Sequence, residues 1–69
     1  EDIINRSREE VNKSPAFIYG IEATATWCEM TAFKYRMRVG TKPDNPVEQD
    51  LDKERWYLNK AKELRSKLE

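Results

Sequence analysis

Apolar residues recur at intervals of three and four along residues 21–39. This spacing places them on one face of an α-helix. The seam consists of Ile21, Ala25, Cys28, Ala32, Tyr35 and Val39. Four more apolar side chains fall outside the seam, namely Trp27, Met30, Phe33 and Met37. Because such a helix is apolar on more than one side, the pattern predicts that it packs against a partner chain as well as its own core.

A second helix is predicted from Pro46 to about Leu68. Asn45, Pro46 and Glu48 have the order of an N-cap, a first-turn proline and a capping-box partner. Gly40 marks the end of the preceding helix, so the connector between the two is short. Two long helices with a short connector predict an antiparallel helical hairpin. The inner stripe of the second helix is expected to hold Val47, Leu51, Leu58, Ala61 and Leu68, widened by Tyr57 and Leu64.

The N-terminal part is more polar. Residues 1–13 predict a short helix or arm, and Ser14-Pro15 and Gly20 mark breaks on either side of an apolar bridge at 16–19. We expect that bridge to pack on the main helices as an extended segment or a single turn. No segment alternates with the period of a strand. The sequence therefore predicts one all-α domain over residues 1–69, with an N-terminal arm at 1–19 and the hairpin at 20–69.

Composition adds the expectation of self-association. The chain has 69 residues, of which 38% are hydrophobic, and no apolar run approaches the roughly 20 residues of a membrane span, so no membrane partner is expected. A domain this small is marginally stable on its own core. A single cysteine and no histidine provide neither an internal disulfide nor a zinc site. Association with further copies remains as the stabilising device, and a homo-oligomer is expected.

The net charge is zero, from 13 basic and 13 acidic side chains, which argues against nucleic acid as a partner. The charges are nevertheless grouped. Residues 34–42 carry a net charge of +4, and residues 43–54 carry −4. Two interpretations stay open: the blocks pair across antiparallel helices, or residues 34–42 form a local anion site.

The chemistry of the chain excludes several enzyme classes. Without histidine, the usual base for a serine or cysteine nucleophile is missing. The two glycines, Gly20 and Gly40, are too few for either of the familiar glycine-rich phosphate loops. No cofactor is indicated with certainty.

Phosphate binding is the function that the cations suggest. Lys34 and Arg38 share a helix face and Lys42 follows near the turn, so the three can hold a phosphate, with Lys53 or Arg55 completing the set from a neighbouring subunit. Tyr35 and Trp56 offer surfaces on which a base can stack. The alternative is that Lys34 and Arg38 pair with acidic residues across the hairpin and that the aromatics belong to the core.

Metal binding has weaker support. Asp50 and Glu54 are one helical turn apart and are the candidate ligands, but a site would need carboxylates from a second subunit. A solvated acidic face is the alternative for this pair.

The pattern of residues along the two predicted helices resembles that of a known family. The segments are Gly20-Ile21-Glu22, then Phe33-Lys34-Tyr35 with Arg38, Gly40 and Lys42, then Asp50-Leu51 with Lys53 and Trp56-Tyr57-Leu58. They resemble the SaV-like family of small bacteriophage proteins, whose function is unknown, over about residues 20–62. The chain departs from the family pattern at Glu54 and in its N-terminal segment. The same segments are similar to part of a podophage kinase that phosphorylates deoxynucleoside monophosphates without a Walker loop.

This resemblance implies a phage protein with a nucleotide-related role in the cytoplasm of an infected bacterium. The residues that it carries over are Lys34, Tyr35, Arg38, Lys42, Asp50, Lys53 and Trp56. The expected function is a nucleotide-binding oligomer that holds phosphates in a basic cleft between subunits, with sequestration of a host defence nucleotide as its use. One alternative is deoxynucleoside monophosphate kinase activity, with ATP and Mg²⁺. Another is a helical adaptor that binds a host protein through its surplus apolar face.

Overall fold

The computed structural model describes residues 2–41 and 46–68 and is helical throughout. The elements are α1 (Asp2–Lys13), the 3₁₀-helix η1 (Pro15–Tyr19), α2 (Ile21–Arg38) and α3 (Val47–Ser66). No residue in the described ranges belongs to a strand, which confirms the predicted all-α class there. The predicted helices at 21–39 and 46–68 match α2 and α3 to within two residues at each end.

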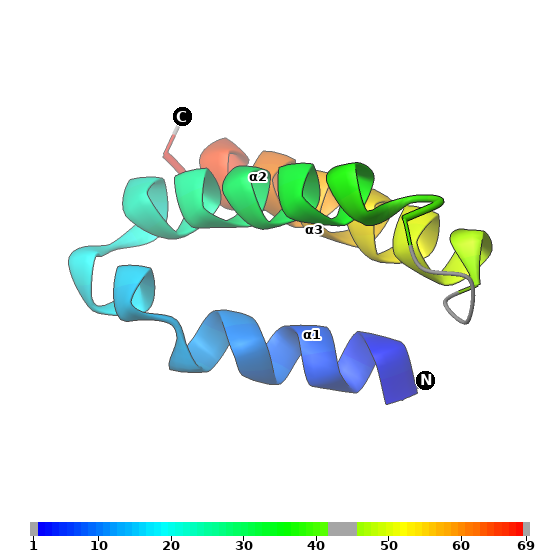
Figure 1. The fold of residues 1–69 in the computed structure, drawn as a ribbon. Helices are drawn as coiled ribbons and strands as arrows, with labels where there is room; N and C mark the ends of the chain where they lie inside the picture. Colours follow the sequence, from blue (N-terminus) through cyan, green and yellow to red (C-terminus); the bar gives the residue numbers. More distant parts are fainter. Residues whose placement is uncertain (1, 42–45, 69) are drawn as a thin grey trace.

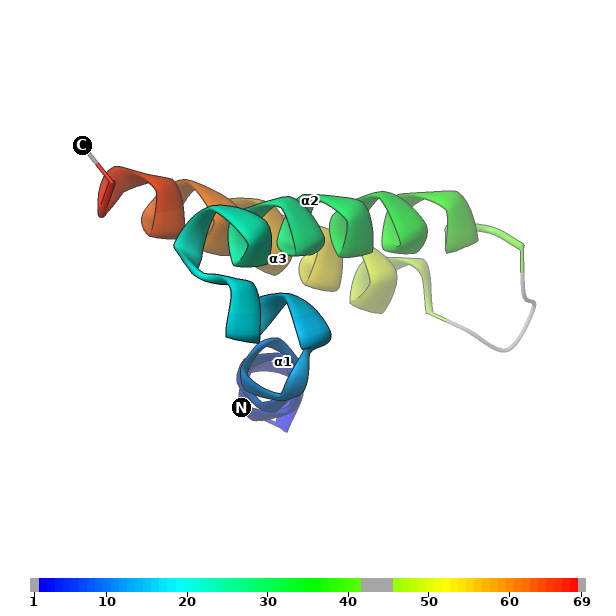
Figure 2. The same ribbon diagram turned by 90° about the vertical axis from the view of Figure 1, so that its left-hand side faces the viewer.

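The three α-helices form two layers. Helices α2 and α3 lie side by side with opposite chain directions, and α1 lies beneath them (Figure 1). After a quarter turn α1 is seen nearly end-on while α2 and α3 still extend across the view, so α1 crosses the pair at an angle (Figure 2). Because of this crossing, α1 packs less extensively on the α2–α3 pair than α2 and α3 pack on each other.

Both predicted glycine breaks are confirmed. Gly20 and Gly40 have φ angles of 107° and 78°, in the left-handed region that glycine adopts without a steric penalty. At the second break α2 ends at Arg38, and the Thr41 N–H donates to the Arg38 carbonyl over 3.1 Å. Pro46 directly precedes α3 and accepts a bond from the Gln49 N–H at 3.2 Å, whereas the predicted N-cap, Asn45, lies outside the described residues.

The bridge at 16–19 forms a single turn that packs on α2, as one of the two predicted alternatives had it. Its apolar side chains, however, remain in solvent: Phe17 is 53% exposed, Ile18 84% and Tyr19 80%. The predicted packing of the bridge on a main helix is therefore confirmed, but these three side chains contribute little to it. A polar bond also joins the turn to α2, since the Thr24 hydroxyl donates to the Ala16 carbonyl at 3.3 Å.

The core is small and centres on Tyr57, which is fully buried. Most of its other members have short side chains, which allow α2 and α3 to approach closely. The buried apolar residues are Val11, Ala25, Cys28, Ala32, Tyr57, Ala61 and Leu64, with Trp27, Tyr35 and Trp56 packed around them. Within the predicted α2 seam, the three central positions are buried and Ile21 is 36% exposed.

The inner stripe of α3 differs from the predicted one. Val47, Leu58 and Leu68 are 43%, 42% and 53% exposed, so these three assignments are wrong. The predicted positions Tyr57, Ala61 and Leu64 are confirmed as buried, and Asp50, which was not predicted, joins them on the buried face of α3. Because Tyr57 points toward the junction of all three helices, Leu58, one residue further and about 100° around the helix, is turned toward solvent.

Candidate functional site

A groove of about 590 Å³ lies between α1 and the α2–α3 pair and is open to solvent on one side. It exists because α1 crosses the pair at an angle and contacts it mainly through α3. Its walls combine cations, carboxylates and aromatic rings from all three helices. The lining residues are Arg6, Ser7, Glu9, Glu10, Lys13, Trp27, Tyr35, Gln49 and Lys53.

The floor of the groove rests on an aromatic cluster around Tyr57. Tyr35 stacks on Tyr57 with ring centroids 5.8 Å apart and an interplanar angle of 15°. Trp27 meets the same ring edge-on at 5.9 Å, and Trp56 does so at 5.0 Å. Offset-stacked and edge-to-face pairs are the arrangements that aromatic rings favour. The two aromatic residues that line the groove, Trp27 and Tyr35, are therefore fixed in position by their packing on the buried Tyr57 ring.

Two of the predicted phosphate-binding residues come together at this floor. The Nζ of Lys53 lies 5.1 Å from the centre of the Tyr35 ring, and the Cζ of Arg38 lies 5.5 Å from it. Both distances are within cation–π range. Lys53 also lines the groove, so its ammonium group stands between the aromatic floor and the space above it.

A hydrogen bond joins the groove wall to the core. The Tyr57 hydroxyl donates to Oε1 of Glu10 at 3.2 Å, which ties α1 to α3. Burial raises the pKa of the Tyr57 phenol far above its ordinary value, so the hydroxyl keeps its proton at neutral pH. Burial also raises the pKa of Tyr35. Both phenols are therefore neutral, and the carboxylate of Glu10 has a permanent donor.

Other predicted binding residues are placed elsewhere. Lys34 is exposed and lines a separate, apolar hollow with Met30 and Phe33 on the outer side of α2. Trp56 is half-buried against the core and borders another hollow next to Arg8. Lys42 lies outside the described residues. Lys34 and Lys53 therefore line two separate hollows and do not converge on one site within the chain.

The candidate metal ligands do not form a shared site in the described ranges. Glu54 accepts a hydrogen bond from Nε of Arg36 at 2.9 Å, and Asp50 is buried with 2% exposure. Oδ2 of Asp50 has no hydrogen-bond partner, an arrangement that costs free energy for a buried carboxylate. No group of three or more aspartate, glutamate or cysteine side chains within residues 2–41 and 46–68 could hold a metal ion.

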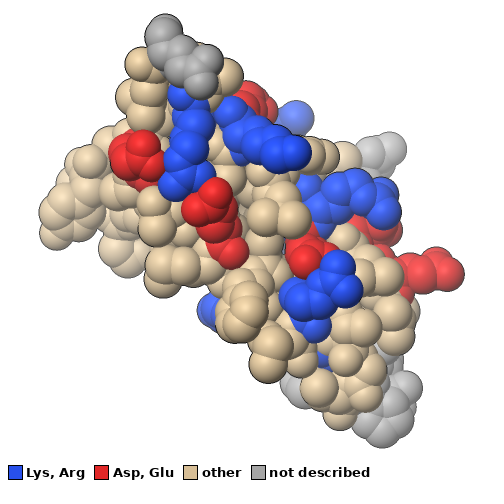
Figure 3. Space-filling model, turned by 90° about the horizontal axis from the view of Figure 1, so that it is seen from above, with Lys and Arg blue, Asp and Glu red and all other residues tan. Residues whose placement is uncertain are grey.

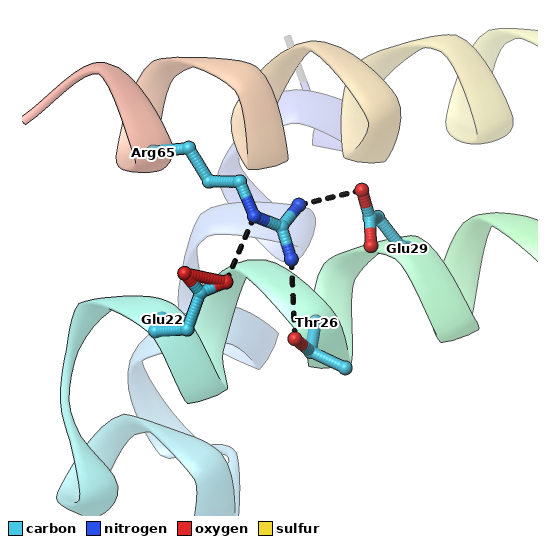
Figure 4. A network of polar contacts seen from close by, with 4 residues as sticks. All are labelled: Glu22, Thr26, Glu29 and Arg65. Carbon is cyan, nitrogen blue, oxygen red and sulfur yellow. Dashed lines mark hydrogen bonds and ion pairs between the residues drawn. The ribbon is translucent and has the colours of Figure 1, made fainter. Parts of the chain in front are cut away.

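The face of the molecule over α2 and α3 carries cations and carboxylates next to one another (Figure 3). Arg65 of α3 bonds to three α2 side chains: Nε to Glu22 at 2.9 Å, Nη1 to Glu29, and Nη2 to the Thr26 hydroxyl at 3.2 Å (Figure 4). Together with Arg36 and Glu54, this network pairs the surfaces of the two helices. Of the two interpretations of the grouped charges, the network corresponds to pairing across antiparallel helices. The cations that pair are Arg36 and Arg65 rather than Lys34 and Arg38.

Seven of the groove residues are not candidates from the sequence, and three of these provide a cation or an aromatic ring: Arg6, Lys13 and Trp27. Arg6 and Lys13 are seven residues apart and so share a face of α1. The sequence shows this spacing, but nothing in the sequence indicates that this face of a polar N-terminal helix lines a site. Trp27 was recognised only as apolar surface next to the seam.

No protein-family model, no curated protein and no solved structure matches this chain. Among the described helices, none combines the length and the apolar character that crossing a bilayer requires.

Proposed function

We propose that this protein binds a nucleotide in the groove between α1 and the α2–α3 pair. The observation that carries the proposal is the placement of Lys53 over the ring of Tyr35, in a groove that also exposes Trp27. Cationic groups next to an aromatic surface match the two chemically different parts of a nucleotide, its phosphates and its base.

The phosphate end would be held by side chains from two helices. Lys53 comes from α3, while Arg6 and Lys13 come from α1, and Arg38 stands next to the Tyr35 ring. Charge-assisted hydrogen bonds from lysine and arginine to phosphate oxygens are the strong class of such bonds. Because the cations come from separate helices, a phosphate group placed between them also stabilises the packing of α1.

The base would stack on Trp27 rather than on the residues expected from the sequence. Tyr35 has Tyr57 against one ring face and two cations near its ring, so it serves to position the cations. Trp56 borders a different hollow. Trp27 is half-buried, braced by Tyr57 and part of the groove wall, which leaves it as the stacking surface.

The acidic residues of the groove favour a small ligand over a polymer. Glu9 and Glu10 lie in the same wall as Arg6 and Lys13. These carboxylates would repel a continuous phosphate backbone, but they can accept hydrogen bonds from the amino group of a base or from a sugar hydroxyl. A single nucleotide has all of these groups within a short distance.

The resemblance to phage proteins suggests sequestration of a host defence nucleotide as the use of such a site. Kinase activity would require carboxylates that hold magnesium near the transferred phosphate. Glu54 is engaged with Arg36, and neither Glu54 nor Asp50 is among the described residues that line the groove, so we propose binding rather than phosphoryl transfer.

Calorimetric titration with a panel of mono-, di- and cyclic nucleotides tests the proposal. We expect at least one nucleotide to release heat, and Lys53→Ala to weaken its binding about tenfold or more through the loss of one charge-assisted contact. Lys62→Ala is the matched control, since Lys62 is an exposed α3 lysine that borders a different hollow. If no nucleotide in the panel gives a signal, or if both variants weaken binding equally, the proposed site is wrong.

A further inference from the structure

Helix α2 carries a second apolar stripe that no described part of the chain covers. Met30, Phe33 and Met37 are 60%, 63% and 61% exposed. Their spacing of three and four residues places them in one row, and Thr26, which is exposed although its hydroxyl accepts a bond from Arg65, continues the row by one turn. The row lies opposite the buried face of the same helix, which contains Cys28. Contiguous apolar rows of this kind mark interaction surfaces.

We propose that a second copy of this chain covers the stripe through antiparallel packing of α2 against the partner's α2. The row has the 4-3-4 spacing of a coiled-coil seam. With a twofold axis passing between Met30 and Phe33, Met30 of one copy lies opposite the partner's Phe33. In the same register Thr26 lies opposite the partner's Met37. Each large side chain therefore meets an apolar or small side chain, and the surface is complementary to itself, as a twofold interface requires.

The residues that flank the stripe favour this register. Glu29 and Arg36 lie on one side of the row, and Trp27 and Lys34 lie on the other. In an antiparallel pair like flanks meet, so Glu29 lies next to the partner's Arg36, and Lys34 lies next to the partner's Trp27. The Glu29 and Arg36 side chains are 48% and 60% exposed, so both can reach across the interface in addition to their contacts within the chain.

A parallel pairing is less complementary. It would place Lys34 next to the partner's Glu29, but Arg36 would have no residue of the partner's α2 beside it, because that helix ends at Arg38. It would also align the two helix dipoles side by side in the same direction, whereas the antiparallel pairing opposes them. The charges and the dipoles thus favour the same orientation.

The antiparallel pairing also assigns a role to Lys34. In this register Lys34 of one copy lies next to the partner's Trp27, and Trp27 is part of the groove wall of its own copy. A lysine that is remote from the groove within one chain is therefore brought next to the groove of the other copy.

The mass of the protein in solution tests the interface without any nucleotide. Sedimentation equilibrium of the wild type should show a dimer. Phe33→Glu should raise the dissociation constant of the dimer about 100-fold or more, because two apolar contacts per dimer are lost. Ile18→Glu is the control, since Ile18 is even more exposed but lies on η1 away from the stripe. Both substitutions are on the surface, and helical circular dichroism confirms that each variant folds.

Disulfide formation tests the register. An equimolar mixture of Met30→Cys and Phe33→Cys should cross-link as a mixed dimer in higher yield than either variant alone, and Thr26→Cys with Met37→Cys should behave likewise. A wild-type monomer, a dimer that survives Phe33→Glu, or preferential cross-linking of Phe33→Cys with itself would each overturn the proposal. A monomer would leave the stripe to a different protein. Because no nucleotide is present, these results are independent of the groove.

Discussion

At the scale of single residues, the core depends on a few side chains whose burial changes their chemistry. Tyr57 is fully buried, and its ring contacts three other aromatic residues while its hydroxyl reaches Glu10. Cys28 is also fully buried, on the α2 seam where the sequence placed it. Periodicity predicts such positions well, because burial on a helix follows directly from spacing. It does not predict that the carboxylate of Asp50 is buried on α3, since polar residues normally indicate the outer face.

Cys28 gives a prediction about alkaline pH. Burial raises the pKa of its thiol from an ordinary 9.0 to about 11. Because the folded state disfavours the thiolate, the thiol contributes stability that is fully present below pH 9 and is lost as the pH rises toward 11, about 2 kcal/mol in all. Urea unfolding at a series of pH values should therefore show that Cys28→Ala loses less stability over this window than the wild type. Equal losses would mean that the thiol is not desolvated.

At the scale of elements, α2 and α3 pack extensively against each other, whereas α1 is attached to them through a few contacts. The sequence predicts the two long helices and their glycine-marked ends because periodicity and breakers are local signals. It predicts neither the exposed η1 side chains nor the exposure of Val47, Leu58 and Leu68 on α3. Both depend on where α1 crosses the pair, which is a property of tertiary packing.

The attachment of α1 can be tested at Tyr57. Tyr57→Phe keeps the ring in the core but removes the donor to Glu10, so we expect a loss of about 1 kcal/mol in the free energy of unfolding. Hydrogen exchange should rise selectively in α1, because this bond joins it to α3. Tyr19→Phe is the control, as Tyr19 is 80% exposed. Uniformly faster exchange over all three helices would contradict the assigned role.

The α2–α3 pair can be tested at Arg65. A lysine cannot contact Glu22, Glu29 and Thr26 from three separate nitrogens as the guanidinium does. Arg65→Lys should lower the melting temperature by a few degrees, and the difference should shrink in high salt. Arg55→Lys serves as the comparison, because Arg55 makes a single exposed pair with Asp52 at 3.7 Å. Equal shifts for the two variants would show that the network adds nothing to a surface ion pair.

At the scale of the whole molecule, α1 and the α2–α3 pair together create the groove, and the outer side of α2 keeps an exposed apolar stripe. The sequence indicates the cations and the surplus apolar surface. It does not indicate which cations share a space, because Lys53 and Lys13 are brought into one groove by the crossing of α1. Nor does it distinguish Trp27 from Trp56, since both are apolar residues on helices and only their tertiary neighbours differ.

The two tryptophans allow the proposed site to be observed directly. Trp27 lines the groove and Trp56 borders a separate hollow, and the chain has no other tryptophan. Tryptophan fluorescence is to be recorded for Trp56→Phe and Trp27→Phe while the nucleotide identified by calorimetry is added. Stacking on Trp27 predicts strong, saturable quenching in Trp56→Phe and little change in Trp27→Phe. Quenching carried by Trp56 alone, or no saturable change in either variant, would contradict nucleotide binding in the groove.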